Sequence, residues 1–127
     1  MVVPSFTIPN TAGGTIISRV RLIVSLGPFT YQAVNFSVNL WTAAPTYSAG
    51  DAGPYGVATG GAGWLANFLP VMTQFGDAAA GAAAVTGANE ATIKLASGTT
   101  VYWDLQTLSY VQPGASQTFT LIPELLN

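Results

Sequence analysis

The sequence predicts an all-β fold built as an antiparallel β-sandwich. Short runs that alternate apolar and polar residues are separated by turn signals, such as Gly-Pro at 27–28 and Pro-Gly at 113–114, at intervals of roughly ten residues. No stretch sustains the 3.6-residue period of an amphipathic helix. Because each run has a single apolar face, we expect two sheets packed on one core. A chain of 127 residues is long enough for one such domain.

The first long strand is predicted over residues 15–25, TIISRVRLIVS. Its alternation gives one face made of Ile16, Val20, Leu22 and Val24 and an opposite face made of Ile17, Arg19, Arg21 and Ile23. Residues 1–14 contain two prolines and no basic segment at the start, so they predict a short extended arm and not a signal peptide. The expected organisation is an N-terminal arm, residues 1–14, followed by a single sandwich domain, residues 15–127.

The cleanest alternation lies in residues 35–42, NFSVNLWT, which predict another strand. The residues expected to point inward are Phe36, Val38, Leu40 and Thr42, and those expected to point outward are Asn35, Ser37, Asn39 and Trp41. In the Ala/Gly-rich residues 43–63 the periodicity disappears, over a length that is unusual for a loop in a compact domain. Such loops are often functional, so the rest of the chain is expected to be a scaffold that presents this arm.

The C-terminal half is expected to supply the remaining strands. Residues 64–75 are apolar enough to be buried, and Pro70 places them at a sheet edge or a bend. Residues 77–89 are rich in alanine but lack an apolar stripe, so we expect a loop with at most one helical turn. Strands are predicted over 91–96, 100–111 and 117–126, with core residues Val101, Trp103, Leu105, Phe119 and Leu121, and a short strand or irregular connection over 29–34.

Charge is scarce in this sequence. Charged residues make up 6% of the chain, against about 25% in an average soluble domain, whereas hydrophobic residues make up 50%. Surface charge normally keeps free monomers apart, so much of this surface is expected to face other protein in an obligate assembly. The alternative is a neutral surface on a protein that is soluble by itself.

The same composition argues against several partners. A net charge of −2 with only three cations cannot neutralise a run of phosphates, so we expect no nucleic acid as a partner. The uncharged run over residues 22–50 is interrupted by Pro28, Gln32, Asn35 and Asn39, so no membrane span is predicted.

The groups that usually carry catalysis or bind metals are mostly missing. The chain has no histidine, no cysteine and one lysine, and its five carboxylates are spread along the sequence, so we do not expect an enzyme. A hydrolase would require two carboxylates that face each other across a cleft. Zinc would lack its preferred ligands, and the segment around Asp51 lacks the run of oxygen ligands that calcium needs, so no metal or cofactor is expected.

Two groups of residues are the candidate sites. Arg19 and Arg21 share one strand face and are expected to form a structural ion pair with Asp104, the alternative being a small contact site for an acidic partner. The second group is a candidate interface, because aromatic side chains anchor many protein contacts. It consists of Trp41, Tyr47, Asp51, Tyr55 and Trp64. The alternative is that these aromatic side chains anchor the arm to its own sheet.

Several segments, taken in order, resemble a group of small tailed-phage head proteins. They are IISRVRLIVS, NFSVNLWTAAPT, the arm segment AGDAGPYG and KLASGTTVYWDLQTLSYVQPGASQTFTL, which together span about residues 15–122. Proteins of that group look like capsid decoration or cement proteins with a β-sandwich or jelly-roll fold. The present chain departs from the group in being poorer in charge.

The resemblance implies a structural virion protein on the outer surface of an icosahedral phage capsid, where it bridges neighbouring major capsid protein subunits. It would be made in the host cytoplasm, and closed symmetry would make it a homo-oligomer, with a trimer preferred to a dimer. The area it buries would stabilise only the assembled shell. The alternative is a carbohydrate- or receptor-binding β-sandwich module of a phage fibre, in which the aromatic side chains of the candidate interface stack on sugar rings.

Overall fold

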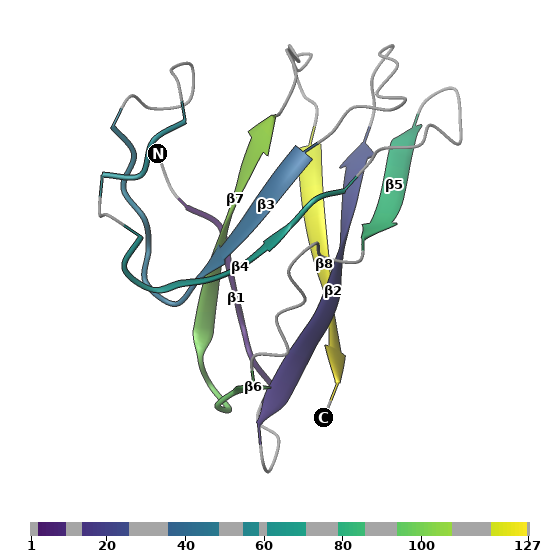
Figure 1. Cartoon of the computed structure of the whole chain (residues 1–127). Coiled ribbons are helices and arrows are strands. Elements are labelled where there is room, and N and C mark those ends of the chain that lie inside the picture. The colour runs from purple at the N-terminus through teal and green to yellow at the C-terminus, as the bar shows by residue number, and fades with distance from the viewer. Residues whose placement is uncertain are drawn as a thin grey trace.

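The computed structural model describes residues 3–9, 14–25, 36–48, 55–58, 61–70, 79–85, 94–107 and 118–126. All regular secondary structure in these ranges is β-strand (Figure 1). The strands are β1 (Ser5–Thr7), β2 (Thr15–Ser25), β3 (Phe36–Trp41), β4 (Trp64–Phe68), β5 (Ala79–Val85), β6 (Lys94–Leu95), β7 (Thr100–Thr107) and β8 (Thr118–Leu126). The predicted all-β fold is confirmed.

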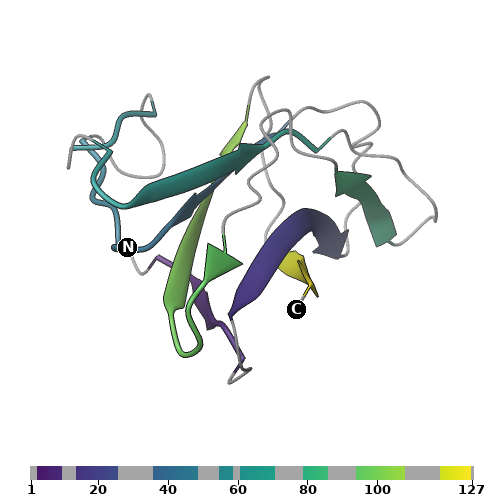
Figure 2. The ribbon, with the colours of Figure 1, turned by 60° about the horizontal axis from the view of Figure 1, so that its bottom comes forward.

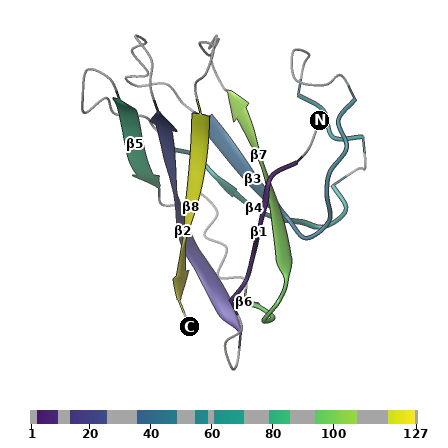
Figure 3. The same cartoon turned by 180° about the vertical axis from the view of Figure 1, so that it is seen from behind.

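The strands form two antiparallel sheets. The first sheet has the order β1-β7-β3-β4, so that β4 lies at an edge. The second is built on β2, which pairs with β8 over most of its length and also with β5 and β6. The two sheets are separate layers when the bottom of the molecule is tilted forward (Figure 2), and the view from behind shows β8 beside β2 and β1 beside β7 (Figure 3). This arrangement is compatible with the expected sandwich.

Apolar side chains from both sheets form the core between them. The buried cluster consists of Ile8, Ile17, Val20, Val38, Leu40, Ala66, Phe68, Leu95 and Val101. Trp103, Leu105 and Leu121 pack against this cluster, as the alternation of their strands predicted. Phe119 meets the buried Phe36 edge to face, with ring centroids 5.9 Å apart. Such aromatic contacts add to the free energy gained by burial alone.

Strand β2 spans the predicted residues, but its residues before Ser18 lie on the opposite faces from those predicted. The pairing of β2 with β8 shifts register between Ile17 and Arg19, which places Ser18 as an extra residue in β2. An extra residue reverses the alternation of side chains along a strand. Ile17 is therefore buried in the core together with Val20, whereas strict alternation had placed it beside the arginines.

Part of the expected N-terminal arm belongs to the sandwich. Strand β1 pairs with β7, with Phe6 opposite Val101. The next residue after the strand, Ile8, is almost completely buried in the core and exchanges backbone hydrogen bonds with the turn at 98–99. Pro4 and Pro9 flank the strand and limit further pairing at this sheet edge.

The alanine-rich residues 77–89 contain a strand that the sequence did not predict. The backbone of β5 pairs with β2, with Arg21 opposite Ala84 and Val20 opposite Val85. Alanine and glycine have low intrinsic preference for strands, so the prediction of a loop was wrong for Ala79–Val85 because pairing with a long neighbouring strand overrides local propensity. The prediction for residues 29–34 lies outside the described residues.

Candidate functional site

The outer face of the first sheet is the most unusual part of the described structure. All six residues of β3 are buried, including Ser37, Asn39 and Trp41, which were expected to face solvent. Asp104 of β7 is also buried on this face, with 9% of its surface exposed. Polar groups in such positions require partners. Some partners come from β3 and β4, and two come from the arm, residues 43–63, whose described part lies beside β7 on the left of Figure 1.

Asp104 is the centre of this site and accepts four hydrogen bonds. Its Oδ1 accepts from Nδ2 of Asn39, the residue directly opposite on β3, at 3.0 Å. Its Oδ2 accepts from Nε1 of Trp41 at 2.8 Å and from the hydroxyls of Tyr47 at 2.8 Å and Tyr55 at 3.0 Å. Every one of these donors is neutral. The carboxylate is thus satisfied by dipoles, and two of its donors come from the arm.

Asn39 connects Asp104 to the edge of the sheet. Its Nδ2 also donates to the Tyr55 hydroxyl at 3.1 Å, so this hydroxyl accepts one hydrogen bond and donates another. Its Oδ1 accepts from Nε1 of Trp64 at 3.3 Å and from Nδ2 of Asn67 at 3.0 Å. We call Asn39, Trp41, Tyr47, Tyr55, Trp64, Asn67 and Asp104 the Asp104 network. A connected network of this kind holds its members in one arrangement.

The backbone of the arm returns on itself as it crosses the sheet. Tyr47 and Val57 form an antiparallel bridge, flanked by hydrogen bonds from Ser48 N to Gly56 O and from Ala58 N to Thr46 O. These bonds place the Tyr47 and Tyr55 rings 6.0 Å apart, with both hydroxyls on the same carboxylate oxygen. The two sides of the arm are therefore fastened to each other and to the sheet.

Gly63 closes the base of the arm. Its carbonyl oxygen accepts a hydrogen bond from Thr42 N at 2.7 Å, and its φ of 78° lies in the left-handed region that favours glycine. A Cβ at this position would lie 2.9 Å from the backbone nitrogen of Ala43. No other residue fits here without displacement of the backbone.

The electrostatics of the network favour a protonated tyrosine. Burial raises the pKa of the Tyr55 phenol above its usual value of 10.0, and the negative charge of Asp104 and the hydrogen bond to it raise this pKa further. The phenol therefore remains a hydrogen-bond donor to the carboxylate at neutral pH.

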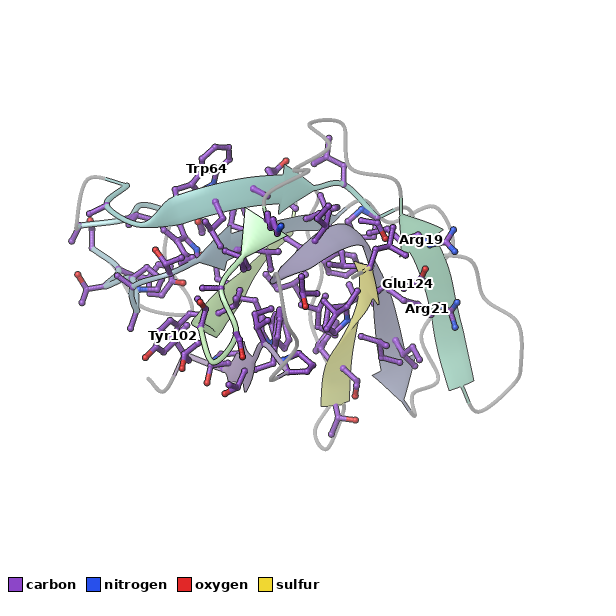
Figure 4. The ribbon with its side chains drawn as sticks, turned by 90° about the horizontal axis from the view of Figure 1, so that it is seen from below. Arg19, Arg21, Trp64, Tyr102 and Glu124 are labelled. Carbon is purple, nitrogen blue, oxygen red and sulfur yellow. The ribbon has the colours of Figure 1, made fainter. Side chains whose placement is uncertain are left out.

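The five predicted interface residues lie in different environments. Trp41 is 3% exposed within the chain, so its assignment to an interface is wrong, and the reason is that the arm covers its strand. Tyr47 is half-buried and, like Tyr55, directs its hydroxyl to Asp104, which agrees with the alternative that the arm is anchored to its own sheet. Trp64 is 46% exposed and points away from the ribbon (Figure 4). Asp51 lies outside the described residues.

The predicted ion pair with Asp104 is also wrong. Arg19 and Arg21 lie on β2 of the second sheet and both pair with Glu124 of β8, through Nε of Arg19 and a terminal nitrogen of Arg21 (Figure 4). The register explains this choice, since Arg19 lies directly opposite Glu124. The arginines do pair with a carboxylate on a neighbouring strand, as expected, but that strand is β8 and not β7.

The described residues were also searched for a metal-binding cluster and for a membrane-spanning helix. Within these ranges no group of three or more His, Cys, Asp or Glu side chains could hold a metal ion. Over the same ranges, no helix has the length and apolar character needed to span a bilayer. What the Asp104 network can do is position an arm. The signal for it in the sequence was the set of aromatic residues with a polar end, Tyr47, Tyr55 and Trp64, close in sequence to a strand with Asn39 and Trp41 on its outer face.

Comparison with known proteins gave no relative: no protein-family model, no curated protein and no solved structure matches this chain.

Proposed function

We propose that this protein is a head decoration or cement protein that binds the outer surface of an icosahedral phage capsid and bridges neighbouring major capsid protein subunits. The observation that carries the proposal is the fastened arm. Tyr47 and Tyr55, one on each side of the arm, both donate to Asp104, so the described residues on the two sides of the arm are held in place before any partner arrives. Preorganisation reduces the entropy lost on binding and so favours a stable contact.

The chemistry of the exposed surface suits a protein partner. Trp64 and Tyr55 are both exposed, and both use their polar atoms inside the network, through Nε1 of Trp64 and the Tyr55 hydroxyl. Their ring faces are what remains for a partner. Aromatic residues in a surface poor in charge are typical of the buried centre of a protein interface. With 6% charged residues, the chain is better suited to an assembled state than to a free monomer.

The proposal includes the oligomer and the fold expected for such proteins. The described residues form eight strands in two sheets, the number found in a jelly roll, and a jelly-roll-like arrangement is part of the proposal. A homo-oligomer, with a trimer preferred, would place equivalent arms around a symmetry axis of the shell. The protein would be made in the host cytoplasm and would join the capsid after the shell has formed.

A carbohydrate-binding module of a phage fibre is the second candidate. The proximity of Trp64 and Tyr55, which both contact Asn39, favours it, because two exposed rings can stack on a sugar. A sugar site also needs free polar groups beside the rings, however. Both polar atoms of the Asn39 amide and the Nδ2 of Asn67 already make hydrogen bonds within the chain, which makes the capsid proposal the stronger one.

The test is co-sedimentation of the purified protein with heads of the phage that encodes it, after the protein has been stripped from them. We expect saturable binding at a fixed ratio to the major capsid protein, and a mass in solution that is a multiple of the chain mass. Heads that retain their own copies serve as the control, because their sites are filled. A stable monomer that stays in the supernatant with stripped heads would overturn the proposal, and retention on immobilised glycans would then favour the second candidate.

A further inference from the structure

The outer face of the second sheet differs from that of the first. No described segment covers it, and Ile122 and Leu126 of β8 are 39% and 56% exposed on it. Between them lies Glu124. On β2 the half-exposed Arg19 lies opposite Glu124, and the half-exposed Arg21 lies opposite Ile122. We call these five residues the arginine face. It combines exposed apolar side chains with two of the three cations of the chain.

The charges of the arginine face do not cancel. Glu124 is the one carboxylate that bridges both guanidinium groups, so two positive charges share one negative charge. Arg19 donates to the Glu124 carboxylate through Nε, and Arg21 donates to it through one terminal nitrogen. A guanidinium carries five N–H donors, and most of those on this face make no hydrogen bond to another described residue. Among the described residues, this cluster therefore has one more positive charge than negative charge, on a protein whose net charge is −2.

The geometry also holds the arginines in place. Arg19 lies opposite Glu124 in the register, and Arg21, two residues further along β2, lies opposite Ile122. The Ser18 hydroxyl donates to the backbone oxygen of Glu124 at 3.2 Å, which adds a contact at the irregularity in β2. A guanidinium group that is already held in one orientation loses less side-chain entropy when it binds a carboxylate.

We propose that the arginine face is a docking surface for a protein partner that presents a carboxylate in apolar surroundings. The proposal rests on the proposed function, and the partner is then the capsid shell. The partner is expected to present a carboxylate because the arginine face has one more positive charge than negative charge, and one carboxylate would balance it. Ile122 and Leu126 would pack on the apolar rim of that group. Two arginines provide too little charge for a nucleic-acid backbone, which needs many phosphate contacts.

Two variants with opposite expected effects test the proposal by co-sedimentation with stripped heads. Arg19→Gln/Arg21→Gln removes the positive charges and should weaken binding about tenfold or more, since charge-assisted bonds across an interface are lost. Glu124→Gln removes the internal competitor, leaves both arginines free and should strengthen binding several-fold. A role limited to the stability of the monomer would predict no gain from Glu124→Gln. Thermal unfolding of each variant confirms that it is folded.

The outcomes separate the docking surface from the function on which it rests. If the unchanged protein binds heads and both variants bind with the same affinity, the docking surface is overturned and the capsid function stands. If the unchanged protein does not bind heads, both are overturned. If the arginine variant binds heads normally but changes the mass in solution, the face joins copies of this chain, and the proposal of a shell carboxylate is wrong. Binding by the unchanged protein that weakens with added salt, with a smaller salt dependence in the arginine variant, supports it.

Discussion

Asn39 and Asp104 lie directly opposite each other on β3 and β7, and the Asn39 amide donates to the Asp104 carboxylate at 3.0 Å. Cross-strand neighbours of this kind are close enough to act as a unit. Here the pair is the point at which the arm meets the sheet, because Tyr55 contacts both residues. The arm and the first sheet are therefore joined at this pair.

Asp104→Asn should destabilise the protein by about 2–3 kcal/mol, because an amide cannot accept all four hydrogen bonds that the carboxylate accepts and leaves a buried donor unpaired. The measurement is urea unfolding followed by tryptophan fluorescence. The matched control is Glu124→Gln, another exchange of a carboxylate for an amide, at a more exposed ion pair, where a change below about 1 kcal/mol is expected. Equal losses in the two variants would show that Asp104 has no special role.

Tyr47→Phe and Tyr55→Phe should each loosen the arm more than they destabilise the whole fold. Each removes one hydroxyl donor to Asp104, at a cost of about 1–2 kcal/mol. Hydrogen exchange of the backbone amides of Ser48 and Ala58 reports the opening of the arm. Tyr102→Phe is the control, because its hydroxyl is not among the donors to Asp104. If amides of the arm and of β3 exchange faster by the same factor, the arm does not open independently.

Stability should fall as the pH rises above about 10, and part of this loss should disappear in Tyr55→Phe. The pKa of Tyr55 is raised in the folded state, so above the unfolded value of 10.0 the folded protein holds a proton that the unfolded chain has released. The contribution of Tyr55 to the free energy of unfolding is therefore fully present below pH 10 and decreases as the pH rises above that value. Chemical unfolding from pH 8 to pH 11 measures the effect. Parallel curves for the two proteins would contradict the raised pKa.

Gly63→Ala should cost about 2–3 kcal/mol, because the added Cβ meets the Ala43 backbone and the residue is left in a left-handed conformation. Gly61→Ala is the matched control. It has a similar φ of 82° but nothing within 4 Å of the added Cβ, so only the conformational cost of about 1 kcal/mol is expected. Thermal unfolding compares the two. A control that is as unstable as Gly63→Ala would show that crowding at Ala43 contributes nothing.

The strands with strong alternation could be predicted from the sequence. The predicted range 15–25 coincides with β2. The alternation also identified the core residues of β3 and β7, except Thr42, which follows β3 and is exposed. Ile17 was assigned to the wrong face because a bulge shifts the phase of a strand, and one extra residue leaves little trace in composition. Strand β5 was missed because its pairing with β2, and not its own residues, determines its conformation.

The candidate site was predicted in part. The aromatic residues near the arm were identified, but the partner of Asp104 was not, because a carboxylate in an outward position of a strand was expected to meet a cation. Four neutral donors can satisfy a buried carboxylate equally well, and they come from segments far apart in the chain. The arginines pair with Glu124 and not with Asp104 because β8 is the neighbour of β2. The order of strands in a sheet cannot be predicted from the alternation within a single strand.

The hydrogen bonds between the two sides of the arm also make the protein a candidate scaffold for displaying foreign peptides. The bonds that fasten the arm lie at residues 46–48 and 56–58, on either side of residues 49–54. A sequence inserted between the two fastened sides leaves Tyr47, Tyr55 and Asp104 unchanged, and the entropy cost of closing a longer chain segment grows only slowly with its length. If the protein covers a capsid as proposed, each particle would then carry many copies of the inserted peptide.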